Sequence, residues 1–182
     1  MSNTTATPTG TWVADAGHSQ VGFAVKHLGI ANVHGTFNDL DGSIEISEDS
    51  SSIKISGTIK AESVDTDHAD RDAHLRSADF FDVEQFPEIR FESTSVSPDG
   101  DDSYKVVGDL TMRGLTNEMT LDVEIEGTET DPWGNDRVGL AISGSLNRSD
   151  WEMKFNQALG SGNVLVSDKV KISLDVSAVK QA

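Results

Sequence analysis

The sequence has no cysteine, no long hydrophobic run and few basic residues. Without cysteine, disulfides, thiolate chemistry and zinc sites that use sulfur ligands are excluded. No run approaches the roughly 18 apolar residues that a membrane-spanning helix needs. The first ten residues, MSNTTATPTG, contain neither a basic segment nor an apolar stretch, so they do not resemble a secretory signal. Unless a leader has been removed, we expect a cytoplasmic protein in which residues 1–10 form a disordered tail.

Acidic residues dominate the charge. The 31 Asp and Glu residues against 14 Lys and Arg give a formal net charge of −17. Such a field repels nucleic acid and anionic lipid head groups, so we do not expect partners that bind through basic patches. Because the Debye length falls to about 3 Å in 1 M salt, this self-repulsion is tolerated best in a salt-rich cell. We expect a halophilic source, with an ordinary soluble acidic protein as the alternative.

Apolar and polar residues alternate along most of the chain, which is typical of strands with one buried face. The segments with this pattern are residues 21–25, 33–46, 53–61, 89–91, 104–112, 119–126, 140–146 and 170–176. In the second segment, Gly35 and Gly42 are the expected bends. Roughly eight antiparallel strands in one domain, residues 11–182, predict a small closed barrel that is either filled or holds one ligand. A β-sandwich fits the same pattern.

Residues 62–92, ESVDTDHADRDAHLRSADFFDVEQFPEIRFE, interrupt the alternation. Neither glycine nor proline occurs between residues 68 and 78, and Asp67 is a plausible N-cap. Pro87 favours an extended conformation for the residue before it, which returns the chain to a strand. The stretch predicts an all-β fold with one short helix inserted at about 67–78, followed by an aromatic hinge.

Four potential metal ligands lie within this helix: His68, Asp70, Asp72 and His74. The two histidines are six residues apart, about 120° out of phase on a helix, so the i, i+4 pair of zinc metalloproteases is absent. The alternative role of Asp72 is an ion pair with Arg76 at i, i+4. We expect no metal site and keep a metal-dependent hydrolase that uses His68 and His74 as an alternative function.

Other catalytic patterns are weak. His18 and Ser19 are adjacent, but neighbouring residues on a strand point to opposite faces. The sequence has no nucleophile elbow, P-loop or dinucleotide fingerprint. We therefore expect no enzymatic activity and no cofactor.

Apolar side chains are the remaining candidates for function. Three phenylalanines, Phe80, Phe81 and Phe86, flank the end of the predicted helix. Together with the apolar strand faces, they form either a packed core or the lining of a pocket for an apolar ligand, and periodicity does not separate the two. A packed core would suit a scaffold or stress protein that binds no ligand.

Four stretches resemble, in order, the landmarks of the YceI-like family. They are TWVADAGHSQVGFAVKHLGIANVHGTFNDLDGSI, DTDHADRDAHLRSADFFDVEQFPEIRFES, VVGDLTMRGLTNEMTLDVE and LNRSDWEMKFN. The resemblance runs from about Thr11 to Ala178 and implies an extended, lipocalin-like, eight-stranded antiparallel barrel. It also implies that the lumen holds an isoprenoid lipid, either an isoprenoid quinone or a polyprenyl chain, and that the protein is a binder or carrier.

The resemblance implies a role for the interrupting stretch, which would close the barrel. The residues expected to contact the ligand are Phe23, Val25, Phe37, Leu75, Phe80, Phe81, Phe86, Phe91, Leu110, Met112, Leu121, Val123 and Trp151. Arg71, Asp72 and Arg76 are expected to latch the helix. His74 either meets a polar head group or is buried with a hydrogen bond to the backbone.

The chain departs from the family pattern at two points. Many members carry a secretion signal, whereas none is visible here. Trp151 and Glu152 stand where the family usually has phenylalanine and glycine after an Asn-Arg-x-Asp element, so the bend there is expected to differ. The expected partner is an isoprenoid lipid, while transient membrane contact and a homodimer are left open.

Overall fold

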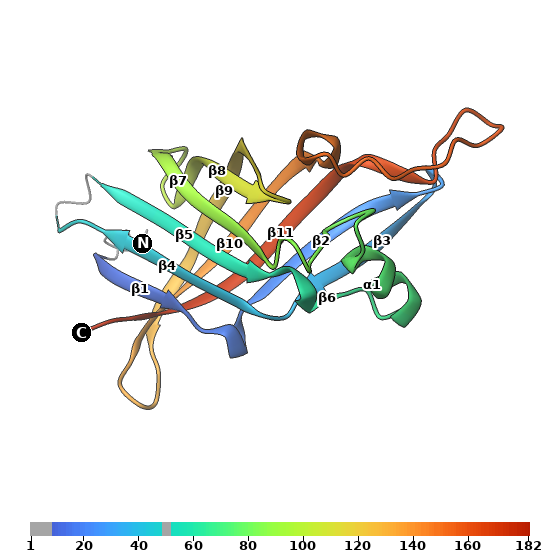
Figure 1. Ribbon diagram of the computed structural model, residues 1–182. Helices are drawn as coiled ribbons and strands as arrows, with labels where there is room; N and C mark the ends of the chain where they lie inside the picture. The colour runs from blue at the N-terminus through green and yellow to red at the C-terminus, as the bar shows by residue number, and fades with distance from the viewer. Residues whose placement is uncertain (1–8, 49–51) are drawn as a thin grey trace.

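The computed structural model describes residues 9–48 and 52–182, which form an elongated antiparallel barrel (Figure 1). The strands in these ranges are β1 (Gly10–Ala14), β2 (Gln20–His27), β3 (Ala31–Phe37), β4 (Leu40–Ile46), β5 (Ile53–Lys60), β6 (Val64–Asp65), β7 (Glu88–Pro98), β8 (Ser103–Met112), β9 (Leu115–Thr130), β10 (Asp136–Asn147) and β11 (Val166–Lys180). The helices are α1 (Ala69–Arg76) and the 3-10 turns η1 (Ala16–His18), η2 (Ala61–Ser63) and η3 (Arg148–Trp151).

Eight of these strands close a ring in the order β1-β4-β5-β7-β8-β9-β10-β11. β1 completes the ring because it pairs with β4 on one side and with β11 on the other. Every pairing in the ring is antiparallel. The predicted eight-stranded antiparallel barrel is therefore confirmed, and the sandwich alternative is wrong.

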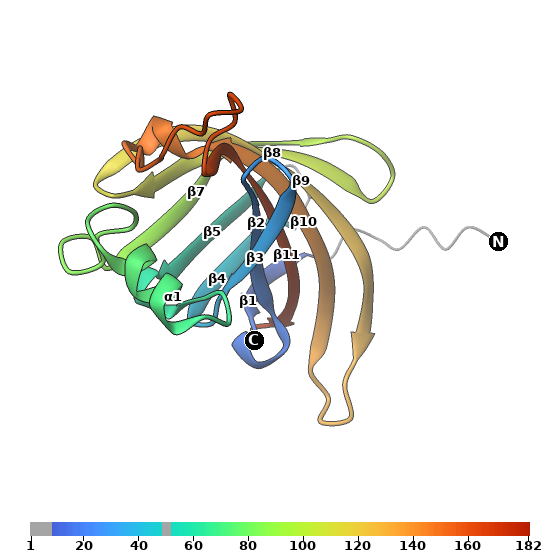
Figure 2. The same cartoon turned by 90° about the vertical axis from the view of Figure 1, so that its right-hand side faces the viewer.

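The two ends of the barrel are built differently. The C-terminal part of β11 pairs with β1, whereas residues 166–175 of β11 pair with β2. β2 in turn pairs with β3, and β3 pairs with the short β6. Strand pairing thus completes the ring at the β1 end, and the β2–β3 hairpin, β6 and α1 surround the other end (Figure 2).

One predicted strand segment is two strands. Residues 33–46 divide into β3 and β4 at Asn38 and Asp39, so the bend is at neither Gly35 nor Gly42. Gly35 lies beneath the ring of Phe23 instead, which passes 2.3 Å from the position that a Cβ atom would take. Because glycine has no Cβ, it leaves room for an aromatic ring on the inner face of the sheet.

The helix α1 confirms the short helix predicted at about 67–78, but not its N-cap. Asp67 has a φ of +61°, in the left-handed region, whereas an N-cap residue is usually extended. His68 takes that role, because its Nδ1 accepts a hydrogen bond from the backbone N–H of Arg71 at 3.2 Å. None of the helices in the described ranges is long and apolar enough to cross a membrane.

The first residues that the structure describes fall within the predicted N-terminal tail. Residues 1–8 of the predicted tail lie outside the described residues. Gly10, also placed in the tail, already pairs with Ile46 at the start of β1. The barrel therefore begins within the range predicted to be disordered.

Side chains fill the barrel at the β1 end. Trp12, Ile46, Val123 and Val138 are buried there, and the space left among the packed side chains is about 30 Å³. We call this region the filled end.

Candidate functional site

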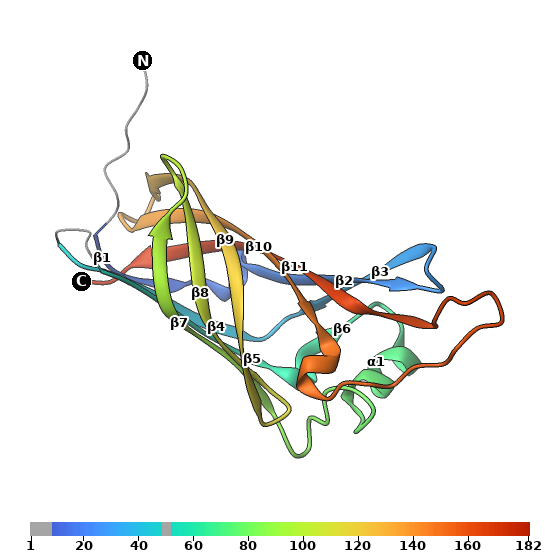
Figure 3. The same ribbon diagram turned by 90° about the horizontal axis from the view of Figure 1, so that it is seen from above.

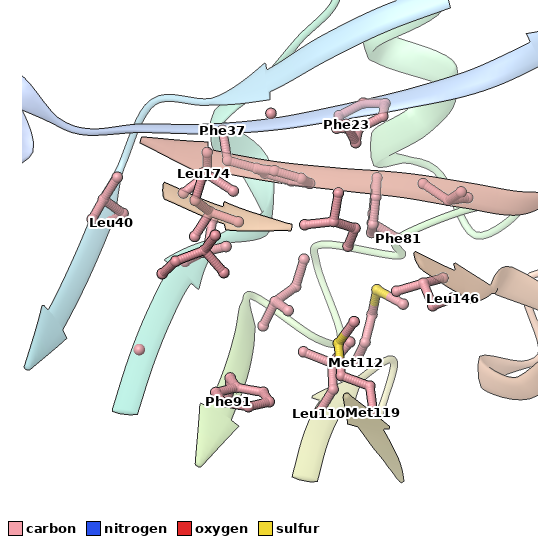
Figure 4. Close-up of a pocket in the computed structure, with 18 of the residues that line it drawn as sticks. Phe23, Phe37, Leu40, Phe81, Phe91, Leu110, Met112, Met119, Leu146 and Leu174 are labelled. Atoms are coloured by element: carbon pink, nitrogen blue, oxygen red, sulfur yellow. The ribbon is translucent and has the colours of Figure 1, made fainter. Parts of the chain in front are cut away.

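A cavity of about 420 Å³ occupies the lumen between the filled end and α1. This volume falls within the roughly 300–1,000 Å³ that is usual for ligand pockets. The lining is almost entirely hydrophobic and comes from the inner faces of strands around the whole ring. Figure 4 shows side chains such as Phe23, Phe81, Phe91 and Leu174 converging on it.

The cavity is long. Residues of β11 line it from the start of the strand to the β1 end: Val166 and then every second residue from Val170, namely Val170, Ile172, Leu174, Val176 and Ala178. At about 3.3 Å per residue, the stretch from Val166 to Ala178 follows roughly 40 Å of strand. The hydrocarbon core of a bilayer is only about 30 Å thick. The length and the apolar lining of the cavity suit an extended hydrocarbon chain better than a compact polar molecule.

Most of the side chains predicted to contact a ligand line this cavity. They are Phe23, Val25, Phe37, Leu75, Phe80, Phe81, Phe91, Leu110, Met112 and Leu121. The alternation along β2, β3, β7, β8 and β9 places seven of them on the inner face, whereas Leu75, Phe80 and Phe81 come from α1 and the turn after it.

Three predicted ligand contacts lie elsewhere. Val123 belongs to the filled end. Trp151 is buried behind the wall, where its indole N–H donates to the carbonyl oxygen of Leu110 at 3.0 Å. Phe86 packs on the β8–β9 turn, where its ring lies 2.8 Å from the position that a Cβ atom on Gly114 would take. Gly114 has a φ of +72°, so glycine suits both the turn and the close approach of the ring.

Other lining residues were missed by the prediction. They include Leu40, Ile44, Ile55, Ile59, Met119, Leu140, Ile142, Leu146, Arg148, Met153, Phe155, Ile172, Leu174 and Val176. Most belong to the same alternating faces that predict the strands, so the pattern could have identified them. Phe155 follows η3 in a segment without such a pattern, and no sequence feature pointed to it.

Aromatic rings join the lumen to residues 69–87, which comprise α1 and the turn after it and which we call the closing segment. The ring of Phe81 lies 5.4 Å from that of Phe37, edge to face. The ring of His74 lies 5.0 Å from that of Phe80 and 4.7 Å from that of Phe155. These separations are within the 4.5–7 Å range of favourable aromatic pairs. The closing segment thus provides an aromatic wall of the cavity.

Two arginines of α1 attach the helix to the chain just before it. Arg71 donates from Nε to the hydroxyl of Thr66 (2.7 Å) and from Nη2 to the carbonyl oxygen of Thr66 (2.8 Å). Arg76 donates from Nε to the carbonyl of Glu62 (2.9 Å) and from Nη2 to the carbonyl of Val64 (3.0 Å). Both side chains therefore hold the helix against η2 and β6, the position that a latch requires.

Asp72 is the buried acid of this latch. Its carboxylate accepts hydrogen bonds from the backbone N–H (2.8 Å) and the hydroxyl (2.5 Å) of Thr66. Thr66 thus takes the place of Arg76, the partner predicted from the i, i+4 spacing. Burial by itself raises the pKa of Asp72, but the Thr66 hydrogen bonds and the charges of Arg76 and Arg71 outweigh it, so the pKa is lowered.

The β8–β9 turn attaches the other side of the closing segment. Arg113 in this turn donates from Nη1 to the carbonyl oxygens of Ala78 (2.9 Å) and Phe80 (2.5 Å). The segment is therefore held both through α1 and through the backbone just before Phe81.

Arg148 is a buried cation in the cavity wall, with 4% of its surface exposed. Its guanidinium donates to three carbonyl oxygens: Ser167 (2.9 Å), Met153 (2.5 Å) and Val166 (3.1 Å). Desolvation lowers the pKa of Arg148, and the charge of Asp168 opposes this effect. Because its donors are occupied by backbone, Arg148 fixes the segment after η3 against the start of β11.

The two histidines of the closing stretch have separate partners. His68 caps α1, and Nε2 of His74 lies 2.9 Å from a carboxylate oxygen of Asp79. The side chain of His74 is 42% exposed, so its predicted burial with a backbone hydrogen bond is wrong. Within residues 9–48 and 52–182, no group of three or more His, Cys, Asp or Glu residues is placed to hold a metal ion.

The bend after η3 accommodates the departure from the family pattern. Glu152 has a φ of +59°, a conformation in which glycine is favoured. A residue with a side chain thus occupies a left-handed position at this bend.

Comparisons with known proteins agree with this architecture. The YceI-like domain matches residues 12–178. Protein YceI of Escherichia coli O17:K52:H18 is 40% identical over 165 residues, which cover 90% of this chain and 83% of that protein. Burkholderia cenocepacia BcnA has a similar structure, with a TM-score of 0.78, 19% identity, and coverage of 90% of this chain and 98% of BcnA.

A second solved structure shares the fold. It is a polyisoprenoid binding domain from Saccharophagus degradans implicated in plant cell wall breakdown, with a TM-score of 0.67 and 16% identity. The alignment covers 93% of this chain and 98% of that domain. The match of residues 12–178 to the YceI-like domain, together with the 40% identity to the Escherichia coli protein, shows that the chain belongs to the YceI-like family.

Proposed function

We propose that the protein binds a long isoprenoid lipid in its lumen, either an isoprenoid quinone or a polyprenyl chain, and carries it without chemical change. The long apolar cavity is the observation that carries this proposal. The structural similarity to a polyisoprenoid binding domain supports it.

The energetics of the lumen agree with such a ligand. An isoprenoid tail offers no hydrogen bonds, so it requires an enclosure that leaves no polar group unpaired. Burial of each methylene contributes about 0.8 kcal/mol, so about ten carbons supply roughly 8 kcal/mol before the cost of ordering the chain. Each further isoprenoid unit adds to this gross energy, and the surplus over the ordering cost appears as affinity.

Two polar side chains line the cavity beside α1 and suit the head group. Arg71 and His74 both belong to the lining, and both carry N–H groups that can donate hydrogen bonds to quinone oxygens. With the head group there, the tail extends toward the filled end. This orientation keeps the charged side chains of α1 away from the hydrocarbon.

A matched pair of tryptophan substitutions on β11 tests binding in the lumen. Leu174 faces the cavity, and its neighbour Ser173 is exposed on the opposite face. We expect Leu174→Trp to weaken binding of a long-tailed quinone about tenfold or more in calorimetric titration, because overpacking of a cavity costs about 1–3 kcal/mol. Ser173→Trp should bind as the wild type does. Equal affinity of all three proteins would show that the ligand does not occupy the lumen.

A further inference from the structure

Two neighbouring segments of this acidic barrel contain no acidic residues. Residues 16–38 and 153–167 contain no aspartate or glutamate, and they are the two longest such runs in the described chain. The structure brings them together, because the backbone N–H of Leu28 donates to the carbonyl oxygen of Leu165 at 3.0 Å. The side-chain amide of Asn163 also donates to the carbonyl of Leu28, at 3.3 Å. We call residues 28–30 and 156–165 the portal loops.

The portal loops expose apolar side chains. Ile30, at the tip of the β2–β3 hairpin, is 77% exposed, and Val164 on the facing loop is 40% exposed. Lys26 precedes the hairpin tip, and Lys154, which is paired with Glu152, precedes the second loop. On a molecule with a net charge of −17, this surface combines exposed hydrocarbon with a local lack of negative charge.

The portal loops also border the lumen. Lys26, His27, Leu165 and Val166 line the cavity, and His27 pairs with Val166 where β2 meets β11. Figures 1 and 3 show the β2–β3 hairpin and the loop before β11 projecting together beyond the barrel, at the end opposite β1. The filled end closes the other side of the lumen.

We propose that the portal loops dock on a lipid bilayer and that the ligand passes between bilayer and lumen at this point. This inference rests on the proposed lipid binding. Anionic lipids repel the acidic surface elsewhere, whereas the portal loops meet no such repulsion. Ile30 and Val164 can enter the interface while Lys26 and Lys154 remain at the level of the head groups.

Docking can be measured without any ligand. We would place a tryptophan at the tip (Ile30→Trp) or at the filled end (Val13→Trp), each together with Trp133→Phe to remove the exposed native indole. Vesicles of phosphatidylcholine with brominated acyl chains quench a tryptophan that enters the bilayer. We expect quenching for Ile30→Trp above that for Val13→Trp, whose position is 39% exposed in the native protein. Equal quenching of the two proteins would overturn the proposal.

Transfer separates docking from binding. We expect the double variant Ile30→Asp, Val164→Asp to take up a long-tailed quinone from phosphatidylcholine vesicles about tenfold more slowly, since burial of one such side chain changes an equilibrium by at least that factor. Its affinity for the same quinone presented in detergent should be unchanged. An unchanged uptake rate would contradict the portal.

The controls distinguish two other outcomes. If the wild-type protein binds no quinone from vesicles or detergent, the proposed function fails, while the quenching experiment still decides whether the tip docks. If sedimentation shows a wild-type dimer that Ile30→Asp converts to a monomer, the tip is an interface between two copies, and the bilayer assignment is wrong.

Discussion

Thr66 and Asp72 are joined by two hydrogen bonds to a single oxygen atom. Oδ1 of Asp72 accepts both from the backbone N–H of Thr66 at 2.8 Å and from its hydroxyl at 2.5 Å. The same hydroxyl accepts from Nε of Arg71, so one threonine connects the acid and the base of α1. Because Thr66 and Asp72 are 6% and 7% exposed, water does not easily replace these bonds. They fix the closing segment over the lumen.

The hydrogen bonds between Thr66 and Asp72 predict a loss of stability in Thr66→Val. This substitution keeps the shape of the side chain and removes its hydroxyl. The substitution leaves the carboxylate of Asp72 with one hydrogen bond fewer, which should lower the free energy of unfolding by about 1–3 kcal/mol. Urea denaturation gives the stability, and hydrogen exchange of the α1 amides should accelerate.

Thr116→Val is the matched control, since its hydroxyl bonds to that of Thr111 on an exposed surface. Its effect should remain within about 0.5 kcal/mol. Similar losses in the two variants would show that the latch contributes no special stability.

Acid should weaken a network of two ion pairs in which Arg137 connects three parts of the barrel. Arg137 on β10 donates to Asp15, beside η1, at 2.9 Å and to Asp131, in the β9–β10 turn, at 2.8 Å. The hydrogen bond from Arg137, followed by that from His18, lowers the pKa of Asp15 to about 2.

Since the pKa of Asp15 is lower in the folded state than the ordinary value of about 3.9, its stabilising contribution is complete above about pH 4. That contribution is lost as the pH falls toward 2. Thermal unfolding of Asp15→Asn should therefore show a shallower fall of Tm between pH 4 and 2 than the wild type. Arg137→Gln should flatten the same region. Parallel Tm profiles in all three proteins would contradict this assignment.

The two buried tryptophans predict different costs of substitution. The indole N–H of Trp12 has no hydrogen-bond partner among the described residues, whereas that of Trp151 donates to Leu110. Trp151→Phe loses a buried hydrogen bond and Trp12→Phe loses none. We expect Trp151→Phe to be the less stable variant by about 1 kcal/mol or more, measured by urea denaturation. The reverse order would show that packing, not hydrogen bonding, distinguishes the two sites.

The alternation of the sequence predicts the barrel well because one face of each strand is buried. It is less informative about boundaries: Asn38 and Asp39, which are also turn-forming residues, separate β3 from β4, and the nearby glycines lie within the strands. Alternation also says nothing of position along the barrel axis. Leu121 and Val123 share one face of β9, yet Leu121 lines the cavity and Val123 belongs to the filled end.

The contacts of the closing segment were predictable only in outline. Its charged residues indicate attachment to the barrel, but the partners of Arg76 and Arg113 are backbone carbonyls. Every residue has a carbonyl, so the sequence does not show which ones an arginine will meet. The i, i+4 rule proposed Arg76 for Asp72 because it considers only residues on the same helix, and Thr66 lies outside α1.

Binding of an isoprenoid lipid in the lumen is the central claim, and extraction of the natively purified protein tests it most directly. Organic solvent should release a stoichiometric isoprenoid lipid, and mass spectrometry of the extract would give its chain length and head group. An empty extract, obtained again after incubation with vesicles that contain isoprenoid quinones, would contradict the claim.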